Sequence, residues 1–259
     1  MVVLEDCMHD FNIISLQEVS GCGRGISKGE DCFGGEVGTS MSCIYSWPEV
    51  CFRPVAVTFD SECTWSRVYT GHSHVSLKLK IKEMKMPILY VCAHLPHMSR
   101  PLDDLTQAID SLVHDISPCM DKCPIILAGD LNYPLLGDLS QRAQMLQQMV
   151  AMLGLKVHSH NGVPARSSGV RRLDHIAINS LFQQECIDQE IQQDSLLTCA
   201  FESYHWDAQL ALGCDHAAIG WEFLMLGSGR KRNRSARAPY NSLKVGKKYV
   251  ANPQAVAHG

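Results

Sequence analysis

The first half of the chain is dominated by short apolar runs with the length of β-strands. Four of these runs are continuous, which is typical of strands buried on both faces, and they occupy residues 12–17 (NIISLQ), 53–59 (RPVAVTF), 87–95 (PILYVCAHL) and 124–130 (PIILAGD). Residues 74–81 (HVSLKLKI) alternate instead. We therefore expect a half-exposed strand there, with Ser76, Lys78 and Lys80 on the exposed face.

Helical periodicity lies between and after these runs. Residues 103–116 (DDLTQAIDSLVHDI) place apolar side chains on one helix face, and Asp103 or Asp104 is expected to cap the helix. Residues 138–154 predict a second helix that Gly154 ends. Two more strands are predicted, at residues 173–179 (LDHIAIN) and 216–223 (HAAIGWEF). Strands interleaved with two or three helices predict an α/β sandwich whose sheets are covered on one face.

Composition narrows the class of protein. The 259 residues are 46% hydrophobic and 19% charged, which excludes collagen, coiled coils and wholesale disorder. The longest apolar runs fall far short of the roughly 18–20 residues that a membrane-spanning helix needs. Acidic residues at the N-terminus (Glu5, Asp6 and Asp10) argue against a signal peptide. We therefore expect an intracellular protein with no membrane span.

Twelve cysteines are scattered through the chain, several of them in apolar runs. Without a signal peptide, they are best interpreted as reduced and mostly buried thiols. Structural zinc is disfavoured because the chain has no CxxC pair, and the nearest spacing, Cys119 and Cys123, has no second pair to close a tetrahedral site.

Charge separates the chain into two parts. Residues 227–259 carry eight Lys and Arg and no acid, so residues 1–226 hold 15 basic and 27 acidic residues, a net charge of −12. With few apolar residues and no period, the segment 227–259 is expected to be a disordered tail, and residues 1–226 a single domain. The tail could contact nucleic-acid phosphates or act as a nuclear address, or it could be a solvated linker.

Acidic residues stand at the ends of the most apolar runs. Glu18 and Asp130 end two of them, whereas Asp174 and Asp215, the latter followed by His216, open two others. If the first two runs lie antiparallel to the last two, these groups meet at one rim of the sheets. Clustered carboxylates repel one another unless a cation lies among them, and oxygen ligands favour Mg²⁺, with Mn²⁺ as an alternative. Individually, such acids are also common as helix caps and turn formers.

Five peptides identify a family. In order and spacing they resemble the endonuclease/exonuclease/phosphatase superfamily, and they are ISLQEV (14–19), AHLPH (93–97), AGDLN (128–132), RLDHIAIN (172–179) and CDHAAIGWEF (214–223). Its members include apurinic endonucleases, LINE-type retrotransposon endonucleases, deadenylases and inositol polyphosphate 5-phosphatases. The resemblance implies a four-layer α/β sandwich, two packed mixed sheets flanked by helices.

The resemblance also implies roles for individual residues. Glu18 would ligate Mg²⁺, and Asp215 would complete the metal environment. Asp130 would orient or deprotonate the attacking water, with Asn132 holding water or a phosphate oxygen.

Three further roles complete the implied site. Asp174 would orient His216 through its ring N–H, and His216 would contact a non-bridging phosphate oxygen. His94 stands where relatives keep His or Tyr against the phosphate. The implied chemistry is in-line attack of water on a phosphoester.

Two departures from the family pattern stand out. The strand that supplies an Asn to the metal site before the Gln17–Glu18 strand has no counterpart, so we expect an N-terminally truncated domain whose first strand is missing. Residues 1–10 resemble the helix that follows that strand. Cys214 stands where relatives usually have Ser, which removes a good hydroxyl donor but leaves the ionisable groups in place.

The leading functional hypothesis is a monomeric, divalent-metal-dependent endonuclease that acts on DNA rather than RNA, similar to retroelement endonuclease domains. The charge of −12 argues mildly against tight DNA binding. One alternative is an inositol phosphate or lipid phosphatase or phosphodiesterase, because GDLNY (129–133) is shared with the 5-phosphatases, although their Cys-Asp-Arg signature is absent. Another is an inactive relic that serves only as a binding module. A Cys/His nucleophile lacks any supporting motif.

Overall fold

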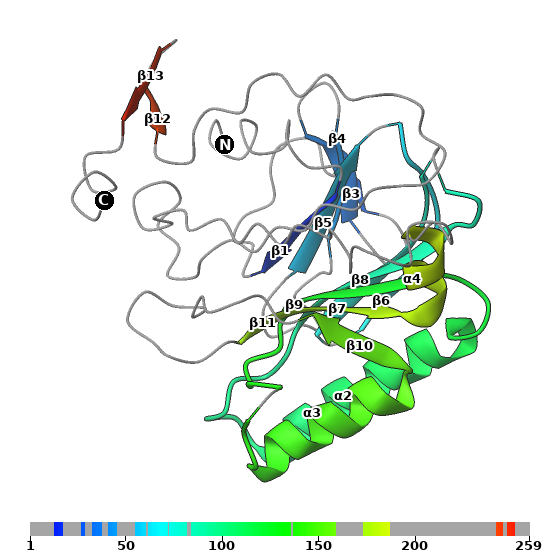
Figure 1. Cartoon of the computed structure of the whole chain (residues 1–259), viewed down its shortest axis with the longest axis vertical. Coiled ribbons are helices and arrows are strands. Elements are labelled where there is room, and N and C mark those ends of the chain that lie inside the picture. Colours follow the sequence, from blue (N-terminus) through cyan, green and yellow to red (C-terminus); the bar gives the residue numbers. More distant parts are fainter. Residues whose placement is uncertain are drawn as a thin grey trace, which may run out of the picture. The chain divides into compact units, whose positions relative to one another are not determined.

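The computed structural model divides the chain into two compact units, Met1–Leu226 and Gly227–Gly259. It describes residues 13–17, 27–28, 33–37, 41–45, 55–60, 62–71, 73–81, 84–135, 137–158, 173–186, 242–245 and 248–251. The first unit contains two β-sheets and a layer of helices (Figure 1).

The smaller of these two sheets has five strands in the order β1-β5-β4-β3-β2, and every described pair in it is antiparallel. Its strands are β1 (Ile13–Gln17), β2 (Ser27–Lys28), β3 (Phe33–Val37), β4 (Met41–Tyr45) and β5 (Val55–Asp60). Consecutive strands β2 to β5 turn back on one another, which makes the described pairs antiparallel; the predicted strand 216–223 lies outside the described residues.

The larger sheet has six strands in the order β10-β11-β9-β8-β7-β6, and it is mixed because β8 and β9 are parallel. Its strands are β6 (Thr64–Thr70), β7 (His74–Lys80), β8 (Ile88–His94), β9 (Ile125–Asp130), β10 (Leu155–His158) and β11 (Asp174–Asn179). Between β8 and β9 runs helix α2 (Leu102–Ile116), which continues into η1 (Ser117–Cys119). Such a crossover is what two neighbouring parallel strands require.

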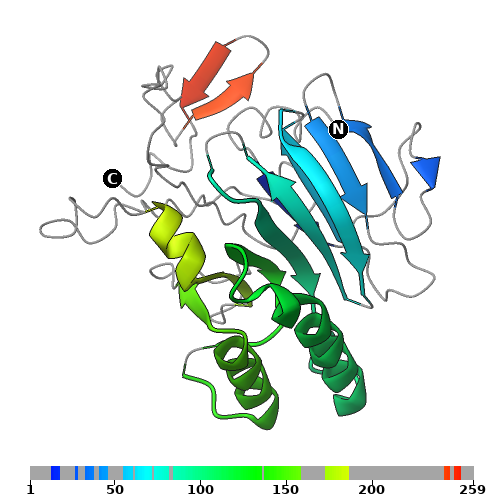
Figure 2. The same cartoon turned by 90° about the vertical axis from the view of Figure 1, so that its right-hand side faces the viewer.

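The remaining helices of this unit are α3 (Gln141–Met152) and α4 (Ser180–Cys186). Figures 1 and 2 show α2 and α3 side by side on one face of the six-stranded sheet, with the five-stranded sheet on its other face. Three layers of the predicted α/β sandwich are therefore described. Residues 1–10, where a helix was expected, lie outside the described part, as do all of residues 187–226 with the predicted strand 216–223.

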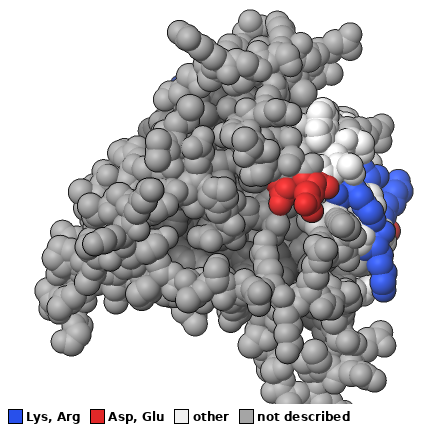
Figure 3. All heavy atoms as spheres, turned by 90° about the horizontal axis from the view of Figure 1, so that it is seen from above, with Lys and Arg blue, Asp and Glu red and all other residues white. Residues whose placement is uncertain are grey.

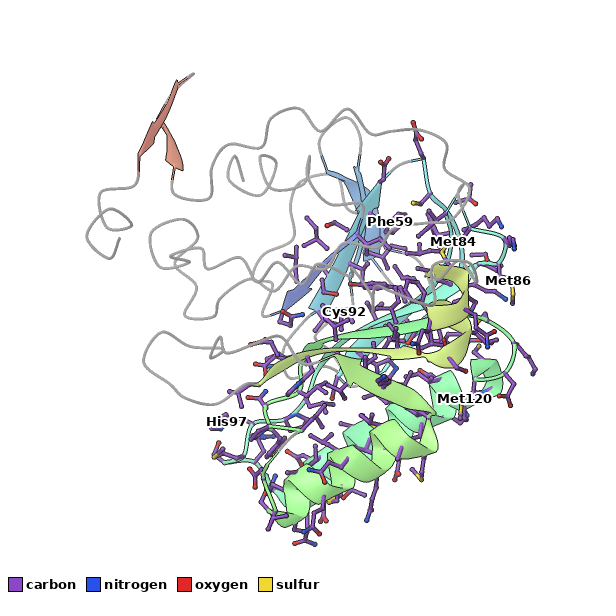
Figure 4. The ribbon with its side chains drawn as sticks, in the orientation of Figure 1. Phe59, Met84, Met86, Cys92, His97 and Met120 are labelled. Carbon is purple, nitrogen blue, oxygen red and sulfur yellow. The ribbon has the colours of Figure 1, made fainter. Side chains whose placement is uncertain are left out.

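Successive side chains of the central strands point to opposite faces of the sheet, so they contribute to two separate cores. On β8, Leu89, Val91 and Ala93 pack beneath the helices, whereas Tyr90 and Cys92 face the other sheet. Figure 4 shows Phe59, from β5, and Cys92 directed into the space between the two sheets. Burial on both faces explains why β8 and β9 are continuous apolar runs in the sequence.

Most predicted elements are confirmed, with small corrections at their ends. Helix α2 begins after Pro101, and neither Asp103 nor Asp104 caps it, although both lie in its first turn, where the helix dipole favours acids. Ser140 caps α3 by accepting a hydrogen bond from the Ala143 N–H. Gly154 follows α3 with φ +60°, the left-handed conformation expected of a helix stop.

The polar face of β7 is not exposed at its start, contrary to the prediction. His74 and Ser76 are both 0% exposed, because α2 covers this face of the sheet. His74 Nε2 donates a 2.8 Å hydrogen bond to Asp115 of α2, and exposed His114 donates another of 3.0 Å. Burial alone would raise the pKa of Asp115, but these two hydrogen bonds outweigh burial and hold the pKa below its usual value.

The second unit contains β12 (Ser242–Val245) and β13 (Lys248–Ala251), which pair as an antiparallel hairpin. The sequence predicted no regular element in this segment. A two-stranded hairpin has little core of its own and is marginally stable by itself. Among the described residues of both units, no helix is long and apolar enough to cross a membrane.

The Asp115 contact predicts a measurable contribution to stability. Asp115→Ala leaves the buried Nε2 of His74 without its acceptor, so we expect the free energy of unfolding at pH 7 to fall by about 1–3 kcal/mol. The matched change Asp110→Ala, at an exposed position of the same helix, is expected to change the free energy of unfolding by no more than about 0.5 kcal/mol. Urea unfolding of both variants measures the difference, and equal losses would contradict the assignment.

The same variant carries a pH signature. Because the folded-state pKa of Asp115 is depressed, its electrostatic stabilisation is complete above the unfolded-state value of about 3.9. This stabilisation is lost as the pH falls through the lower folded-state value. The difference in free energy of unfolding between wild type and Asp115→Ala should therefore become smaller below about pH 4. A difference that grows there would contradict a depressed pKa for Asp115.

At Gly129 the backbones of β8 and β9 lie too close together to admit a side chain. Its φ is +146°, and a Cβ at this position would overlap the backbone carbonyl of Ala93. Gly137 also has a positive φ, +77°, but open space surrounds it. We expect Gly129→Ala to destabilise the fold by about 1–3 kcal/mol more than Gly137→Ala, because only the former overpacks the structure. Thermal unfolding of the two variants compares them directly, and equal effects would show that the strands can separate freely.

Candidate active site

Three predicted site residues lie at one end of three neighbouring strands. His94 is the last residue of β8, Asp130 the last of β9 and Asp174 the first of β11. In the backbone register His94 is paired with Asp130 across the parallel pair, and Asp174 is paired with Asp130 across the antiparallel pair. For Asp130 and Asp174, the antiparallel arrangement proposed from the sequence is thus observed.

The three side chains also share one face of the sheet. Tyr90 and Cys92 of β8 face the five-stranded sheet, so His94, two positions further on, lies on that same face. Ala128 and Ile176 pack in the core between the sheets. Asp130 lies two positions after Ala128 and Asp174 two positions before Ile176, so both aspartates lie on this face as well. The end of the space between the sheets is therefore where these polar groups gather.

Strand β1 of the other sheet runs toward the same end. Ser15 and Tyr90 share a hydrogen bond of 2.9 Å, and Gln17 Nε2 lies 3.6 Å from Cys92 Sγ. Both contacts advance along β1 and β8 in the same direction, so β1 ends where β8 ends. Burial raises the pKa of Tyr90, which keeps its hydroxyl neutral in this contact.

Asp130 is buried and held in place by its surroundings. Its side chain is 8% exposed, and Oδ2 lies 3.8 Å from His94 Nε2, whose side chain is 2% exposed. Oδ1 accepts a 2.8 Å hydrogen bond from the backbone N–H of Asn132. A carboxylate fixed in this way beside an imidazole is suited to accept a proton from a bound water.

Asn132 has a left-handed backbone, with φ +59°. Its side-chain Nδ2 donates a 2.7 Å hydrogen bond to the carbonyl of Leu95, the residue after β8. The resemblance implied that this amide holds water or a phosphate oxygen. In the structure, one of its N–H groups ties the loop after β9 to the end of β8.

Three residues near the site were not identified from the sequence. Tyr133, next to Asn132, receives a 2.9 Å hydrogen bond on its carbonyl from His175 Nε2 and a 3.1 Å bond on its hydroxyl from Arg142. His175 directly follows Asp174, so its side chain lies on the opposite face of β11, toward the helices. The alternation rule applied to the DH pair could have suggested a supporting residue on this face.

The other predicted site residues are not placed by the structure. Glu18, Asp215 and His216 lie outside the described residues. Within the described part of the chain, no group of three or more His, Cys, Asp and Glu could hold a metal ion. Four described cysteines form no disulfide, three of them buried, and they are Cys63, Cys92, Cys119 and Cys123.

The donor types present nevertheless suit a hard cation. Asp130 and Asp174 are directly opposed on neighbouring strands, where like charges destabilise a sheet. A divalent ion near this pair would relieve the repulsion, and carboxylate oxygen is the donor that Mg²⁺ prefers. Two carboxylates alone make an incomplete ligand set, so such a site needs further ligands.

Neither a protein-family model nor a curated protein matches this sequence. Solved structures do match the fold. The endonuclease domain of TRAS1, a telomere-specific non-LTR retrotransposon, has a TM-score of 0.58 at 15% identity, over 86% of this chain and 90% of that one. The 3′ phosphatase NExo from Neisseria, bound to a product DNA hairpin, has a TM-score of 0.55 at 14% identity, over 85% of this chain and 93% of that one.

A third similar structure carries the family name itself. An endonuclease/exonuclease/phosphatase family protein from Leptotrichia buccalis has a TM-score of 0.50 at 15% identity, over 69% of this chain and 80% of that one. The matched structures thus include a nuclease and a phosphatase that share one architecture. This chain has the fold of the endonuclease/exonuclease/phosphatase superfamily, as the peptides in its sequence predicted.

Proposed function

We propose that this protein is a divalent-metal-dependent phosphodiesterase that cuts DNA. The observation that carries the proposal is the pairing of Asp130 with both His94 and Asp174 at one sheet end, in a fold shared with a retrotransposon endonuclease domain. A buried carboxylate between an imidazole and a second carboxylate provides a base, a phosphate contact and a cation ligand in one place.

In the proposed reaction, Asp130 accepts a proton from the water whose oxygen bonds to phosphorus. The P–O bond to the leaving sugar oxygen breaks, and that oxygen takes a proton from solvent. The hydrogen bond from the Asn132 N–H to Oδ1 fixes the orientation of this carboxylate. His94, 3.8 Å from Oδ2, is placed to donate its ring N–H to a non-bridging phosphate oxygen, which stabilises the charge that grows in the transition state.

Magnesium would be held by carboxylates at the same rim. We propose Glu18 and Asp215 as ligands, because β1 ends at the rim one residue before Glu18, and because a cation there would offset the repulsion between the opposed Asp130 and Asp174. A bound Mg²⁺ neutralises phosphate charge during hydrolysis. Asp174 would in addition orient His216.

DNA as substrate is supported by the distribution of basic residues. Although residues 1–226 carry a net charge of −12, Lys and Arg side chains of the described residues gather at one edge of the molecule, beside acidic ones (Figure 3). Lys78 and Lys80 of β7, and Lys85 in the turn to β8, are among the described lysines, and the strand register places Lys80 and Lys85 at the opposite end of the sheet from His94. We therefore propose that the eight basic residues of 227–259, rather than these lysines, contact DNA phosphates. The basic tail also supports a nuclear location.

A phosphomonoesterase is the second candidate function. The 3′ phosphatase NExo shares the fold over 85% of this chain. The residues proposed above would equally well direct a water onto a terminal phosphate. The two functions differ in their products, because only a phosphodiesterase breaks the backbone of a DNA strand.

The proposal predicts metal-dependent nicking. Purified protein with Mg²⁺ should convert supercoiled plasmid to the open circular form, and EDTA should abolish the conversion. Asp130→Asn retains the shape of the side chain and an acceptor for the Asn132 N–H, but it removes the base, so we expect the nicking rate to fall by at least about 100-fold. Gel electrophoresis of time points measures the rate.

The matched control is Asp121→Asn, the same chemical change at an exposed turn position, which should keep the wild-type rate. Release of inorganic phosphate from a 3′-phosphorylated oligonucleotide, without nicking, would move the assignment to a phosphatase. Wild-type protein that neither nicks nor releases phosphate would remove the enzymatic proposal and leave a binding module.

Metal binding is tested separately from catalysis. Calorimetric titration of Mg²⁺ into the full chain should give a saturable heat, and Glu18→Gln should weaken the affinity by about tenfold or more, because the variant loses a charged oxygen ligand. Glu62→Gln, an exposed change on the turn after β5, is the control. No saturable heat with the wild-type protein would contradict a preformed magnesium site.

A further inference from the structure

We propose that Tyr133, Arg142 and His175 are positioning residues, which hold Asp130 and Asn132 in the geometry needed for phosphoester hydrolysis without touching the substrate. The inference rests on the function proposed above and extends it to the side of the sheet that faces the helices. We call these three residues the support group.

Tyr133 is the centre of the support group. It is 2% exposed and follows Asn132 directly. Its hydroxyl accepts a 3.1 Å hydrogen bond from Arg142 Nη1, on the first turn of α3, and its carbonyl accepts a 2.9 Å bond from His175 Nε2, on β11. Helix α3 and strand β11 therefore hold the same residue through two different atoms.

The backbone next to Tyr133 needs such support. Asn132 has φ +59°, a left-handed conformation that is disfavoured for residues with a Cβ but less so for Asn than for most. In that conformation its N–H reaches Asp130 Oδ1 at 2.8 Å. A disfavoured backbone persists only where its surroundings over-determine it, so a weaker hold on Tyr133 should let Asn132 relax and release the carboxylate.

The support group also joins two loops at the rim. Arg142 Nη2 donates a 2.7 Å hydrogen bond to the carbonyl of Arg100, in the loop between β8 and α2. Asn132 Nδ2 bonds the Leu95 carbonyl at the start of that same loop. Because the loop begins after His94, it positions His94 relative to Asp130. Figure 4 shows His97 of this loop at the end of the six-stranded sheet, beyond the labelled core residues.

Two facts separate His175, the support-group residue on β11, from the reacting groups. His175 is 8% exposed and lies on the opposite face of β11 from Asp174. Its Nε2 must carry a hydrogen, because a carbonyl only accepts. His175 therefore acts by donating a hydrogen bond to the backbone, and any side chain that donates from the same place should replace it.

The test compares His175→Gln with His175→Leu in the full-length protein. The amide nitrogen of Gln can replace Nε2 as a donor, whereas Leu fills the space and leaves the Tyr133 carbonyl without this bond. We expect His175→Leu to lower kcat for plasmid nicking by at least about tenfold with KM unchanged, and His175→Gln to recover most of that loss. His114→Leu, at an 87% exposed histidine, is the matched control and should leave kcat unchanged.

Hydrogen exchange provides a readout independent of activity. The backbone N–H of Asn132 is bonded to Asp130, so its exchange should accelerate in His175→Leu and return toward the wild-type rate in His175→Gln. If the wild-type protein shows no Asp130-dependent hydrolysis, the proposed function fails, but the exchange rates still decide whether the support group holds this loop.

A gentler variant covers the case in which His175→Leu does not fold. Tyr133→Phe removes only the hydroxyl that Arg142 contacts, so it should fold, accelerate exchange at Asn132 and lower kcat without changing KM. Unchanged exchange at Asn132 in Tyr133→Phe and in whichever His175 variants fold would overturn the proposal, as would a loss of kcat that Gln fails to recover.

Discussion

The backbone hydrogen-bond ladder on the two sides of β9 is the interaction on which the rest of this molecule depends. On one side β8 runs parallel to β9, and on the other β11 runs antiparallel. Two carboxyl ends and one amino end therefore come together at a single edge. A shift of register by one residue would turn Asp130 or Asp174 to the opposite face, so the ladder fixes the chemistry more firmly than any single side-chain contact.

The second sheet is aligned with this edge by polar contacts inside an otherwise apolar layer. The Ser15–Tyr90 hydrogen bond and the contact of Gln17 with Cys92 connect β1 to β8. Apolar packing between sheets tolerates sliding, whereas a buried polar group that loses its partner is costly. These pairs therefore specify how far β1 extends along the rim.

The sequence predicted a strand correctly where the apolar pattern of the segment matched its burial in the folded protein. The runs at residues 87–95 and 124–130 became β8 and β9 because burial on both faces demands apolar side chains at every position. Strands β3 and β6 were missed because β3 contains two glycines, Gly34 and Gly35, and β6 mixes polar and aromatic residues around a register shift. Neither strand has the continuous apolar run or the strict alternation that predicts a strand.

The site was partly predictable for the same reason. Residue type and position at strand ends singled out Asp130 and Asp174, and the observed register places them opposite each other. Alternation within the DH pair points to a residue on the helix-facing side at His175, but its partner could not be predicted, because that partner is a carbonyl 42 positions away. Similarly, alternation in the sequence predicts a solvent-facing polar face of β7, but α2, which lies later in the chain, covers His74.

The contact between Gly129 and the backbone of Ala93 bears on how this scaffold could be re-engineered. Since main chain rests on main chain at this point, no choice of neighbouring side chains can make room for a larger residue. Any combinatorial library aimed at altering selectivity should keep Gly129 invariant. Diversity belongs instead at outward-facing positions such as Met98 and Leu139, which are 41% and 84% exposed and lie on the connections that leave β8 and β9.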